Sequence, residues 1–328
     1  MLLVFEVGGT TVRAGRFDPV GRRLVRRTDR PTPNHLTATG GTDELWVRLL
    51  DLMAGLGAEL FPDAGPAAVS VAYPGPVDGD ACVLAAPTVL GQGGATRFPL
   101  AEACRARWPG ARVAVTNDLS AIGYRYVELG ARDFAVVTVG SGIGHKIFLD
   151  GRPLVGPRGW GGEIGHLRVD HGPDAAPCEC GGQGHVGALA SGRGTVAAVR
   201  RLARVDQPGF RASALGEGGD IDDIDGEAVA AAFRDGDRWV REAVRASAAH
   251  LGHALAALHL AVGVDRIIVV GGFAFALGEP YRAMLVDACA AACWNIGQDW
   301  DEIVELGIPD DDGGMIGAGV FALDRFQP

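Results

Sequence analysis

The sequence contains a single lysine, Lys146, so arginine carries nearly all of its positive charge. Lysine and arginine together number 30, against 40 acidic residues, which gives a formal net charge of -10. This acidic excess argues against a nucleic-acid partner, because such partners require basic surfaces. The one arginine-rich run, at 22–27, is expected to be the solvated edge of a hairpin.

Long apolar runs are also missing. No stretch reaches the ~20 apolar residues of a membrane-spanning helix, so no membrane association is expected. The apolar segment 1–7 is interrupted by Glu6 and followed by glycines, which argues against a signal peptide. Six cysteines in 328 residues are too few for a disulfide scaffold, so a cytoplasmic protein is expected.

The remaining pattern predicts two similar halves, each alternating strands with helices. In the first half we expect strands over 2–7, 12–18, 22–27, 67–72 and 112–116, and helices over 43–60, 100–108 and 119–129. In the second half we expect strands over 134–139, 146–149 and 266–270, and helices from 191, over 237–261 and from 313. Asp43 is the expected cap of the first helix. This order predicts the α/β class.

A glycine-rich turn follows the first strand of each half. The first turn contains Gly8, Gly9, Thr10 and Thr11, and the second contains Ser141 and Gly142. Such turns expose backbone N–H groups that bind phosphate oxygens, although a single one is more often only a tight hairpin. Two turns at equivalent places predict a polyphosphate site, and neither has P-loop spacing.

Asn117 and Asp118 lie where an apolar strand gives way to a helix. Asp118 either caps that helix or serves as a base that takes a proton from a hydroxyl group. Phosphoryl transfer needs such a carboxylate near the acceptor hydroxyl.

A set of potential metal ligands follows in the second half. The set consists of His166, Cys178, Cys180 and His185. Two thiolates and two imidazoles suit tetrahedral Zn²⁺, and the glycines between them let the loop turn back. His171 is a rival ligand on spacing, and loss of the metal in this chain is the other alternative.

In their order, these motifs resemble the ROK family of sugar kinases, within the hexokinase and actin ATPase superfamily. The matching segments are Val7–Thr10, Tyr73–Asp78, Asn117–Asp118, Gly140–Gly144, Gly162–His166, Cys178–Gly184 and Val269–Gly272. The resemblance implies a two-domain actin-like, ribonuclease H-like ATPase fold with a duplicated mixed sheet flanked by helices. We expect an N-terminal domain over 1–118, completed by 313–328, and a C-terminal domain over 119–312 that holds the zinc loop 166–185.

The resemblance also implies roles for individual residues. Asp118 would be the general base on a primary hydroxyl of a hexose-like ring. The ring would be bound by Asn117, Glu163, His166 and Gly75. ATP with Mg²⁺ would be bound by Gly8, Gly9, Thr10, Thr11, Ser141, Gly142, Gly271 and Gly272. Structural Zn²⁺ would orient His166, and the protein would be a homodimer.

Four positions depart from the family pattern. Glu6 replaces an aspartate near the magnesium, and His185 replaces the third zinc cysteine. Gly187 stands where the family has a ring-binding glutamate, which favours an altered ring such as the aminosugar kanosamine or a C7 cyclitol. Lys146 stands beside the second phosphate turn in place of a glycine, and it is expected to contact solvent rather than ATP.

Alternatives to a modified-ring kinase follow from the same resemblance. An ordinary glucokinase or N-acetylhexosamine kinase would keep the chemistry with another acceptor, and a polyphosphate donor would need a basic groove. A sugar-sensing ROK regulator or a binding protein would be non-enzymatic. Because the first strand is expected from Leu2, no room is expected for a helix-turn-helix, so the kinase is favoured.

Overall fold

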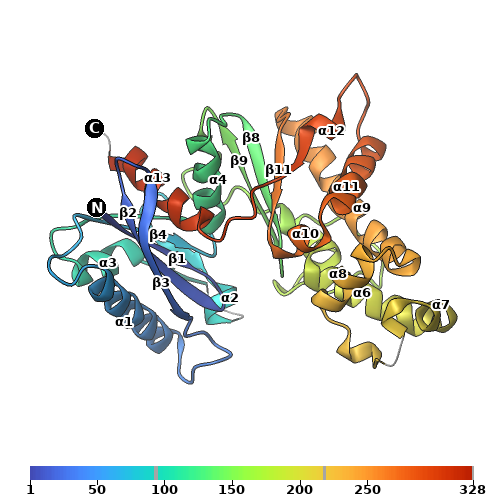
Figure 1. The fold of residues 1–328 in the computed structure, drawn as a ribbon, viewed down its shortest axis with the longest axis horizontal. Coiled ribbons are helices and arrows are strands. Elements are labelled where there is room, and N and C mark those ends of the chain that lie inside the picture. Colours follow the sequence, from blue (N-terminus) through green and yellow to red (C-terminus); the bar gives the residue numbers. More distant parts are fainter. Residues whose placement is uncertain (92–94, 217–218, 327–328) are drawn as a thin grey trace. The chain divides into compact units, whose positions relative to one another are not determined.

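The computed structural model of the chain describes residues 1–91, 95–216 and 219–326 (Figure 1). The chain forms two compact units, each with its own hydrophobic core. Unit 1 comprises Met1–Arg132, Phe148–Gly161 and the residues from Asp310 onward. Unit 2 comprises Asp133–Ile147 and Gly162–Pro309.

Unit 1 is built on a five-stranded mixed sheet in the order β3-β2-β1-β4-β7. Its strands are β1 (Leu2–Val7), β2 (Thr11–Asp18), β3 (Arg23–Pro31), β4 (Ala68–Tyr73) and β7 (Arg112–Asn117). Strands β1, β4 and β7 are parallel, whereas β1, β2 and β3 form an antiparallel meander. β4 is buried at every position, as expected of a parallel strand covered on both faces. All five expected strands are present, and β3 runs on to Pro31.

The helices of unit 1 cover both faces of this sheet (Figure 1). They are α1 (Thr42–Leu60), α2 (Pro87–Leu90), α3 (Leu100–Arg107), α4 (Asp118–Glu128) and α13 (Gly313–Phe326), beside a small sheet of β5 (Val83–Ala85) and β6 (Ala95–Phe98). Since side chains alternate along a strand, Val71 packs in the core with α1 and α3, while its neighbour Ala72 packs with Ala121 of α4 and Ala318 of α13.

The last helix, α13, is fastened to this sheet and to α4. The Ser70 hydroxyl of β4 donates a hydrogen bond to the main-chain oxygen of Ala318 at 2.7 Å. A Cβ atom at Gly317 would lie 1.7 Å from the main-chain oxygen of Ala121, so only glycine permits this approach of α13 to α4.

The expected cap of α1 is wrong by two residues. The helix begins at Thr42 with Gly41 at the N-cap, and no side chain caps it. Asp43 lies inside the first turn instead, where its negative charge favours the helix through the helix dipole.

Unit 2 contains most of a second five-stranded sheet, in the order β10-β9-β8-β11-β12. Its strands are β8 (Phe134–Val139), β9 (Ile143–Leu149), β10 (Arg152–Pro153), β11 (Ile267–Val270) and β12 (Val304–Leu306). β11 lies between β8 and β12 and is parallel to both. Each unit therefore has three neighbouring parallel strands in its sheet, which agrees with the expected duplication.

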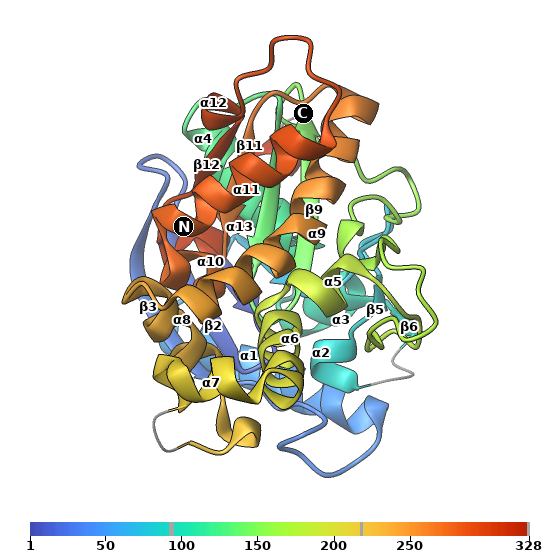
Figure 2. The same cartoon turned by 90° about the vertical axis from the view of Figure 1, so that its right-hand side faces the viewer.

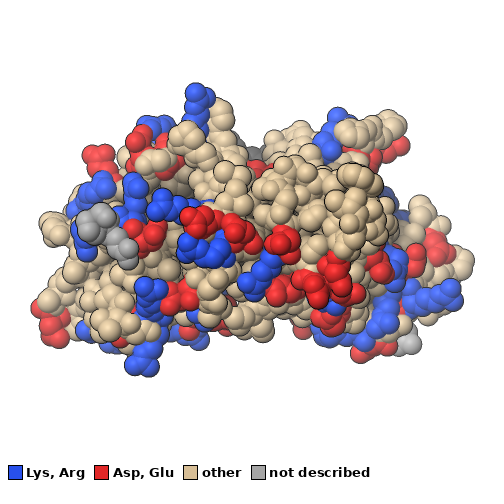
Figure 3. All heavy atoms as spheres, turned by 90° about the horizontal axis from the view of Figure 1, so that it is seen from above, with Lys and Arg blue, Asp and Glu red and all other residues tan. Residues whose placement is uncertain are grey.

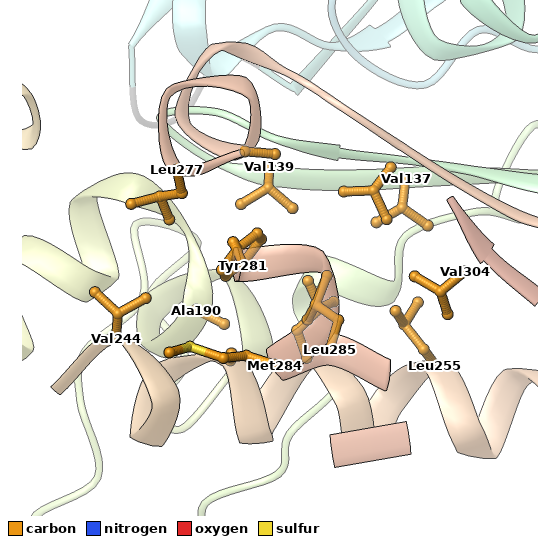
Figure 4. Packing of buried hydrophobic residues seen from close by; sticks show 14 of the residues in the cluster. Val137, Val139, Ala190, Val244, Leu255, Leu277, Tyr281, Met284, Leu285 and Val304 are labelled. Carbon is orange, nitrogen blue, oxygen red and sulfur yellow. The ribbon is translucent and has the colours of Figure 1, made fainter. Parts of the chain in front are cut away.

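Helices α9 and α11 cover this second sheet (Figure 2). The helical segments of unit 2 are η1 (Ile164–His166), α5 (Val186–Ala190), α6 (Gly192–Val205), α7 (Gln207–Ala212), η2 (Ala214–Gly216), η3 (Ile221–Asp223), α8 (Gly226–Arg234), α9 (Arg238–Val262), α10 (Gly272–Leu277), α11 (Glu279–Ala292) and α12 (Trp300–Ile303). Figure 4 shows Val137 and Val139 of β8 pointing toward a layer that includes Leu255 of α9 and Leu285 of α11. Among the described residues, no helix is both long and apolar enough to span a bilayer.

Candidate active site

The first predicted phosphate turn joins β1 to β2 in unit 1 and is held by three hydrogen bonds. The amide of Gly8 donates to the main-chain oxygen of Thr11 at 2.9 Å, which closes the turn. The Thr32 hydroxyl donates to the Gly8 oxygen at 2.8 Å, and Asn34 Nδ2 donates to the Gly9 oxygen at 2.7 Å. Since the two carbonyls are engaged from behind, the turn is held in one geometry, as phosphate binding by backbone amides requires.

Asn117, the last residue of β7, caps α4. Its Oδ1 accepts from the amides of Leu119 at 3.0 Å and Ser120 at 3.2 Å, and its Nδ2 donates to the Gly75 oxygen at 2.9 Å. The Gly75 backbone has a φ of +130°, and a Cβ there would lie 2.1 Å from the Ala85 oxygen. Gly75 therefore has a structural role, because it anchors the amide beside the candidate base.

Asp118 is the first residue of α4, one position beyond the cap. Its Oδ1 accepts from the Leu119 amide and from Asn117 Nδ2, each at 2.8 Å. The interpretation of Asp118 as the helix cap is therefore wrong, since Asn117 occupies that position. Two donors hold the Asp118 carboxylate at the end of β7, where the sequence predicts a general base.

Glu6 of β1 is a largely buried carboxylate in the same unit. Arg13 Nη1 lies 3.4 Å from Glu6 Oε2, yet Oε2 makes no hydrogen bond within the described structure. Burial raises the pKa of Glu6 to about 7, and the charges of Asp118 and Asp312 add to this rise while Arg13 opposes it. A buried carboxylate oxygen without a hydrogen-bond donor fits a cation or its bound water.

The second phosphate turn, Gly140–Gly142, joins β8 to β9 in unit 2. The Gly140 amide donates to the Gly142 oxygen at 3.0 Å, and the Gly192 amide at the start of α6 donates to the Gly140 oxygen at 2.8 Å. Arg193 adds a bond from Nε to the Ser141 oxygen at 2.7 Å. The turn is thus attached to the first turn of α6.

A groove of about 1080 Å³ opens beside this turn. Its lining residues include Ser141 and Gly272, from two separate segments that the sequence predicts for ATP binding, together with Phe273, Arg193 and Arg200. Gly271 has a φ of +108°, and a Cβ there would lie 2.7 Å from the Val139 oxygen. A groove with an aromatic ring, arginines and a glycine turn suits a nucleotide. No signal in the sequence identified Arg193, Arg200 or Phe273.

Lys146 lies at a different place from the one expected. The side chain is buried in unit 2, and its Nζ lies 3.0 Å from Glu163 Oε1 and 3.2 Å from the Gly162 oxygen. The expectation that Lys146 contacts solvent is wrong. The lysine instead supports Glu163, one of the residues predicted to bind a ring.

His145, the neighbour of Lys146 on β9, also contacts the segment 162–164. Its Nδ1 accepts a hydrogen bond from the Ile164 amide at 3.0 Å, immediately after Glu163. Burial lowers the pKa of His145 to about 4, and the charge of Lys146 adds to this effect, so the ring is neutral at pH 7. The sequence carried no signal for this contact.

The four predicted metal ligands come together in unit 2. One ligand atom from each of His166, Cys178, Cys180 and His185 lies within 4.8 Å of the other three. The His185 Nδ1 and Cys180 Sγ atoms are 3.3 Å apart, and the His166 Nδ1 and Cys178 Sγ atoms are 3.8 Å apart. Tetrahedral Zn²⁺ with its usual bond lengths separates its ligand atoms by roughly 3.3–3.8 Å.

The electrostatics of this cluster also fit a cation. Burial raises the pKa of Cys178, so its thiolate needs a positive partner. Burial and the neighbouring His166 lower the pKa of His185, which favours the neutral imidazole that binds metals. His171 is not a member of this group among the described residues.

Gly187 lies in α5 (Val186–Ala190), directly against the segment 163–166, whose Glu163 and His166 are predicted to bind a ring. A Cβ at this position would lie 3.1 Å from the Gly165 oxygen. The segment 163–166 therefore has a bare backbone neighbour at the position where the family resemblance implies a glutamate. The Glu163 carboxylate of this segment is paired with Lys146.

The comparison with known proteins agrees with these motifs. The ROK family model matches residues 5–325. The chain is 41% identical over 333 residues to a C(7)-cyclitol 7-kinase of Streptomyces hygroscopicus subsp. jinggangensis, and the match covers 99% of this chain and 94% of that protein. The chain is also 33% identical over 202 residues to an N-acetylmannosamine kinase of Salmonella typhimurium. This match covers 60% of this chain and 64% of the kinase.

Solved structures resemble the fold across nearly the whole chain. A ROK family glucokinase from Streptomyces griseus, crystallised with glucose and AMPPNP, has a TM-score of 0.78 at 27% identity and covers 98% of this chain and 99% of its own. A ROK hexokinase from Thermus thermophilus has a TM-score of 0.75 at 24% identity, with 99% of each chain covered. The actin-like α/β fold predicted from the sequence is confirmed, and the chain belongs to the ROK family.

Proposed function

We propose that this protein is an ATP-dependent kinase that phosphorylates a primary hydroxyl of a C7 cyclitol. The observation that carries the chemistry is the placement of Asp118 beside the Asn117 cap, with its carboxylate fixed by two donors. The identity of 41% with a C(7)-cyclitol 7-kinase over 99% of the chain supports the acceptor.

In the proposed reaction, Asp118 is the general base. Its carboxylate accepts the proton of the acceptor hydroxyl while the hydroxyl oxygen attacks the γ-phosphorus of ATP. Such transfers depend on positioning and electrostatics rather than on a covalent enzyme intermediate. The bonds from Asn117 and Leu119 to Asp118 Oδ1 supply that positioning, because they leave the carboxylate little freedom to turn.

The two glycine turns are the proposed phosphate sites. Gly8, Gly9, Thr10 and Thr11 would bind phosphate oxygens from unit 1, and Ser141, Gly142, Gly271 and Gly272 would bind the nucleotide from unit 2. Mg²⁺ on ATP would neutralise the phosphate charge, and Glu6 Oε2, which accepts no hydrogen bond in the described structure, is a suitable acceptor for one of its water molecules.

The proposed ring contacts are the residues that the family resemblance implies. Asn117 would contribute from unit 1, where Gly75 holds its amide in place. Glu163 and His166 would contribute from unit 2. Gly187 supplies no carboxylate where the family resemblance implies a ring-binding glutamate. This supports an acceptor that lacks the hydroxyl which that glutamate would bind, and so an acceptor other than plain glucose.

Zinc in the cluster of four ligands is also part of the proposal. His166 would bind the metal through Nδ1, which lies 3.8 Å from Cys178 Sγ, and its other nitrogen would remain for a ring hydroxyl. The metal would therefore fix the orientation of a substrate contact. We further propose that the enzyme works as a cytoplasmic homodimer without nucleic-acid partners. On the face drawn in Figure 3, acidic and basic side chains are interspersed, so this face does not present the basic surface that a nucleic acid would need.

A coupled assay with ATP and Mg²⁺ tests this function directly. The acceptors would be C7 cyclitols, glucose, mannose, N-acetylmannosamine and kanosamine, and a C7 cyclitol is expected to have the highest kcat/KM. Asp118→Asn should lower kcat by about a thousandfold while the protein stays folded. Asp63→Asn, at an exposed aspartate in the same unit, is the matched control. Phosphorylation of none of these acceptors, or near-normal turnover by Asp118→Asn, would contradict the proposal.

A further inference from the structure

The only lysine of the chain is buried directly behind the ring-binding carboxylate of unit 2. The Lys146 side chain is 3% exposed and the Glu163 side chain is 38% exposed. The ammonium group therefore lies on the protein side of the pair, and the carboxylate lies on the open side. The two groups are 3.0 Å apart, which is ion-pair distance.

The backbone around this pair is shaped to receive the lysine. Gly162 has a φ of +88°, and a Cβ there would lie 2.6 Å from both Lys146 Cδ and Nζ. The Gly162 oxygen accepts a hydrogen bond from the same Nζ at 3.2 Å. The neighbouring His145 fastens the Ile164 amide, so two successive residues of β9 hold the segment 162–164. The contact is thus part of the built structure and not a chance approach of an exposed side chain.

Pairing changes the charge that a ligand meets. An unpaired Glu163 would present a full negative charge and would attract an ammonium group on a ring. With Lys146 at 3.0 Å the pair is neutral overall, and a ligand ammonium on Glu163 would approach a second cation that is itself buried. The Glu163 oxygens still accept hydrogen bonds from neutral hydroxyls. Gly187 adds no compensating carboxylate on the facing helix α5.

We propose that Lys146 makes the ring site selective for uncharged polyhydroxylated rings over rings that carry an amino group. This inference rests on the kinase function proposed above and refines its acceptor to a neutral cyclitol. It excludes aminosugars such as kanosamine as preferred acceptors. Lys146 is a positioning residue here, because it acts through Glu163 and does not touch the ring.

The test compares matched pairs of acceptors that differ by one hydroxyl or amino group, such as glucose with kanosamine and a C7 cyclitol with its aminated analogue. For the wild-type enzyme, kcat/KM should favour the neutral member of each pair by at least about tenfold. Lys146→Met keeps the length of the side chain and removes the charge, so this ratio should fall by about tenfold or more, mainly through KM. Lys146→Arg should keep the preference for the neutral ring.

A double variant separates the charge effect from a structural one. In a Glu163→Gln background the carboxylate is gone. Lys146→Met should then leave the ratio of kcat/KM for the neutral ring to kcat/KM for the aminated ring nearly unchanged, whereas it lowers this ratio in the wild type. Thermal unfolding of every variant checks that each is folded. If the wild type phosphorylates neutral and aminated rings equally well, or if Lys146→Met leaves the ratio unchanged, the selectivity proposal is overturned. If no ring is phosphorylated at all, the kinase function itself fails instead.

Discussion

Arg193 donates a hydrogen bond from Nε to the main-chain oxygen of Ser141, and its two terminal nitrogens donate to the carboxylate of Glu179. Ser141 belongs to the second phosphate turn, whereas Glu179 lies between the cluster cysteines Cys178 and Cys180. One guanidinium thus joins the loop of predicted zinc ligands to the proposed nucleotide site. We expect Arg193→Ala to raise the KM for ATP by about fivefold, because the turn loses a charge-assisted bond of ~1 kcal/mol. Steady-state kinetics with varied ATP measure this change.

The control for Arg193 is Arg204→Ala. Arg204 lines the same groove but pairs with Asp222, away from the phosphate turn. Its loss should leave the KM for ATP within about twofold of the wild-type value, as is usual for exposed ion pairs. Equal effects of the two variants would show that the groove, and not the link to Ser141, controls ATP binding.

Glu6 should make unit 1 less stable as the pH rises. Its pKa is about 7 in the folded protein and near 4.5 in the unfolded chain, so between these values the folded state binds the extra proton. The contribution of Glu6 to the free energy of unfolding is therefore fully present below about pH 4.5. It is lost as the pH rises from about 4.5 through 7, by about 3 kcal/mol in total. Chemical denaturation across this range should show the fall in the wild type, and Glu6→Gln should remove it.

The matched control for Glu6 is Glu102→Gln, at an exposed glutamate of α3 in the same unit. This variant should keep the wild-type pH dependence, because it leaves Glu6 and its surroundings unchanged. A Glu6→Gln protein with the same slope as the wild type would refute the assignment of the effect to Glu6.

Metal analysis of the purified protein should find about one zinc per chain. Removal by a strong chelator should lower the Tm of unit 2 by about 5 °C, which corresponds to ~2 kcal/mol for a unit of this size. It should also raise the KM for the ring acceptor more than the KM for ATP, because the proposed orientation of His166 depends on the metal. Calorimetry and kinetics on the same preparations measure both effects.

Two variants separate metal binding from simple loop damage. Cys178→Ser should lose the zinc, while His185→Cys should retain it, since three thiolates and one imidazole also suit the metal. A metal-free wild type with full activity and unchanged Tm would exclude a structural zinc.

Gly317→Ala should destabilise unit 1 by about 2 kcal/mol or more. Its Cβ would lie 1.7 Å from the Ala121 oxygen, so α13 must move away from α4. Gly55→Ala in α1 is the opposite case, because no atom lies within 4 Å of its new Cβ. That control should gain about 0.5–1 kcal/mol from the higher helix propensity of alanine. Denaturant midpoints of the two variants should therefore shift in opposite directions.

The strands and the glycine turns could be predicted because each depends on a local pattern. β1 ends at Val7 and its turn begins at Gly8, so the apolar run and the glycines that follow it mark the boundary together. The cluster of His166, Cys178, Cys180 and His185 was predictable for a related reason. Cys178, Cys180 and His185 lie within eight positions of one another. Because zinc prefers cysteine and histidine ligands, few residues in the chain could be the fourth ligand.

The partners of Lys146 could not be predicted from the sequence. Glu163 lies 17 positions further along the chain, after a segment that leaves unit 2 at Phe148 and returns at Gly162. A statistical expectation based on residue type puts lysine in solvent, and only tertiary packing overrides it. The same holds for Arg193, whose contact with Ser141 spans 52 positions.

Because Lys146 is the single lysine and is buried, its chemical modification can report local opening of the structure around it. Acylating reagents directed at lysine find no exposed ε-amino group in the described structure, because Lys146 is 2% exposed. We expect the residue to become reactive when local opening exposes it, for example when the segment from Gly162 to Ile164 separates from β9. Its rate of acylation therefore follows the local opening of this part of unit 2, and a ring that binds Glu163 should slow it.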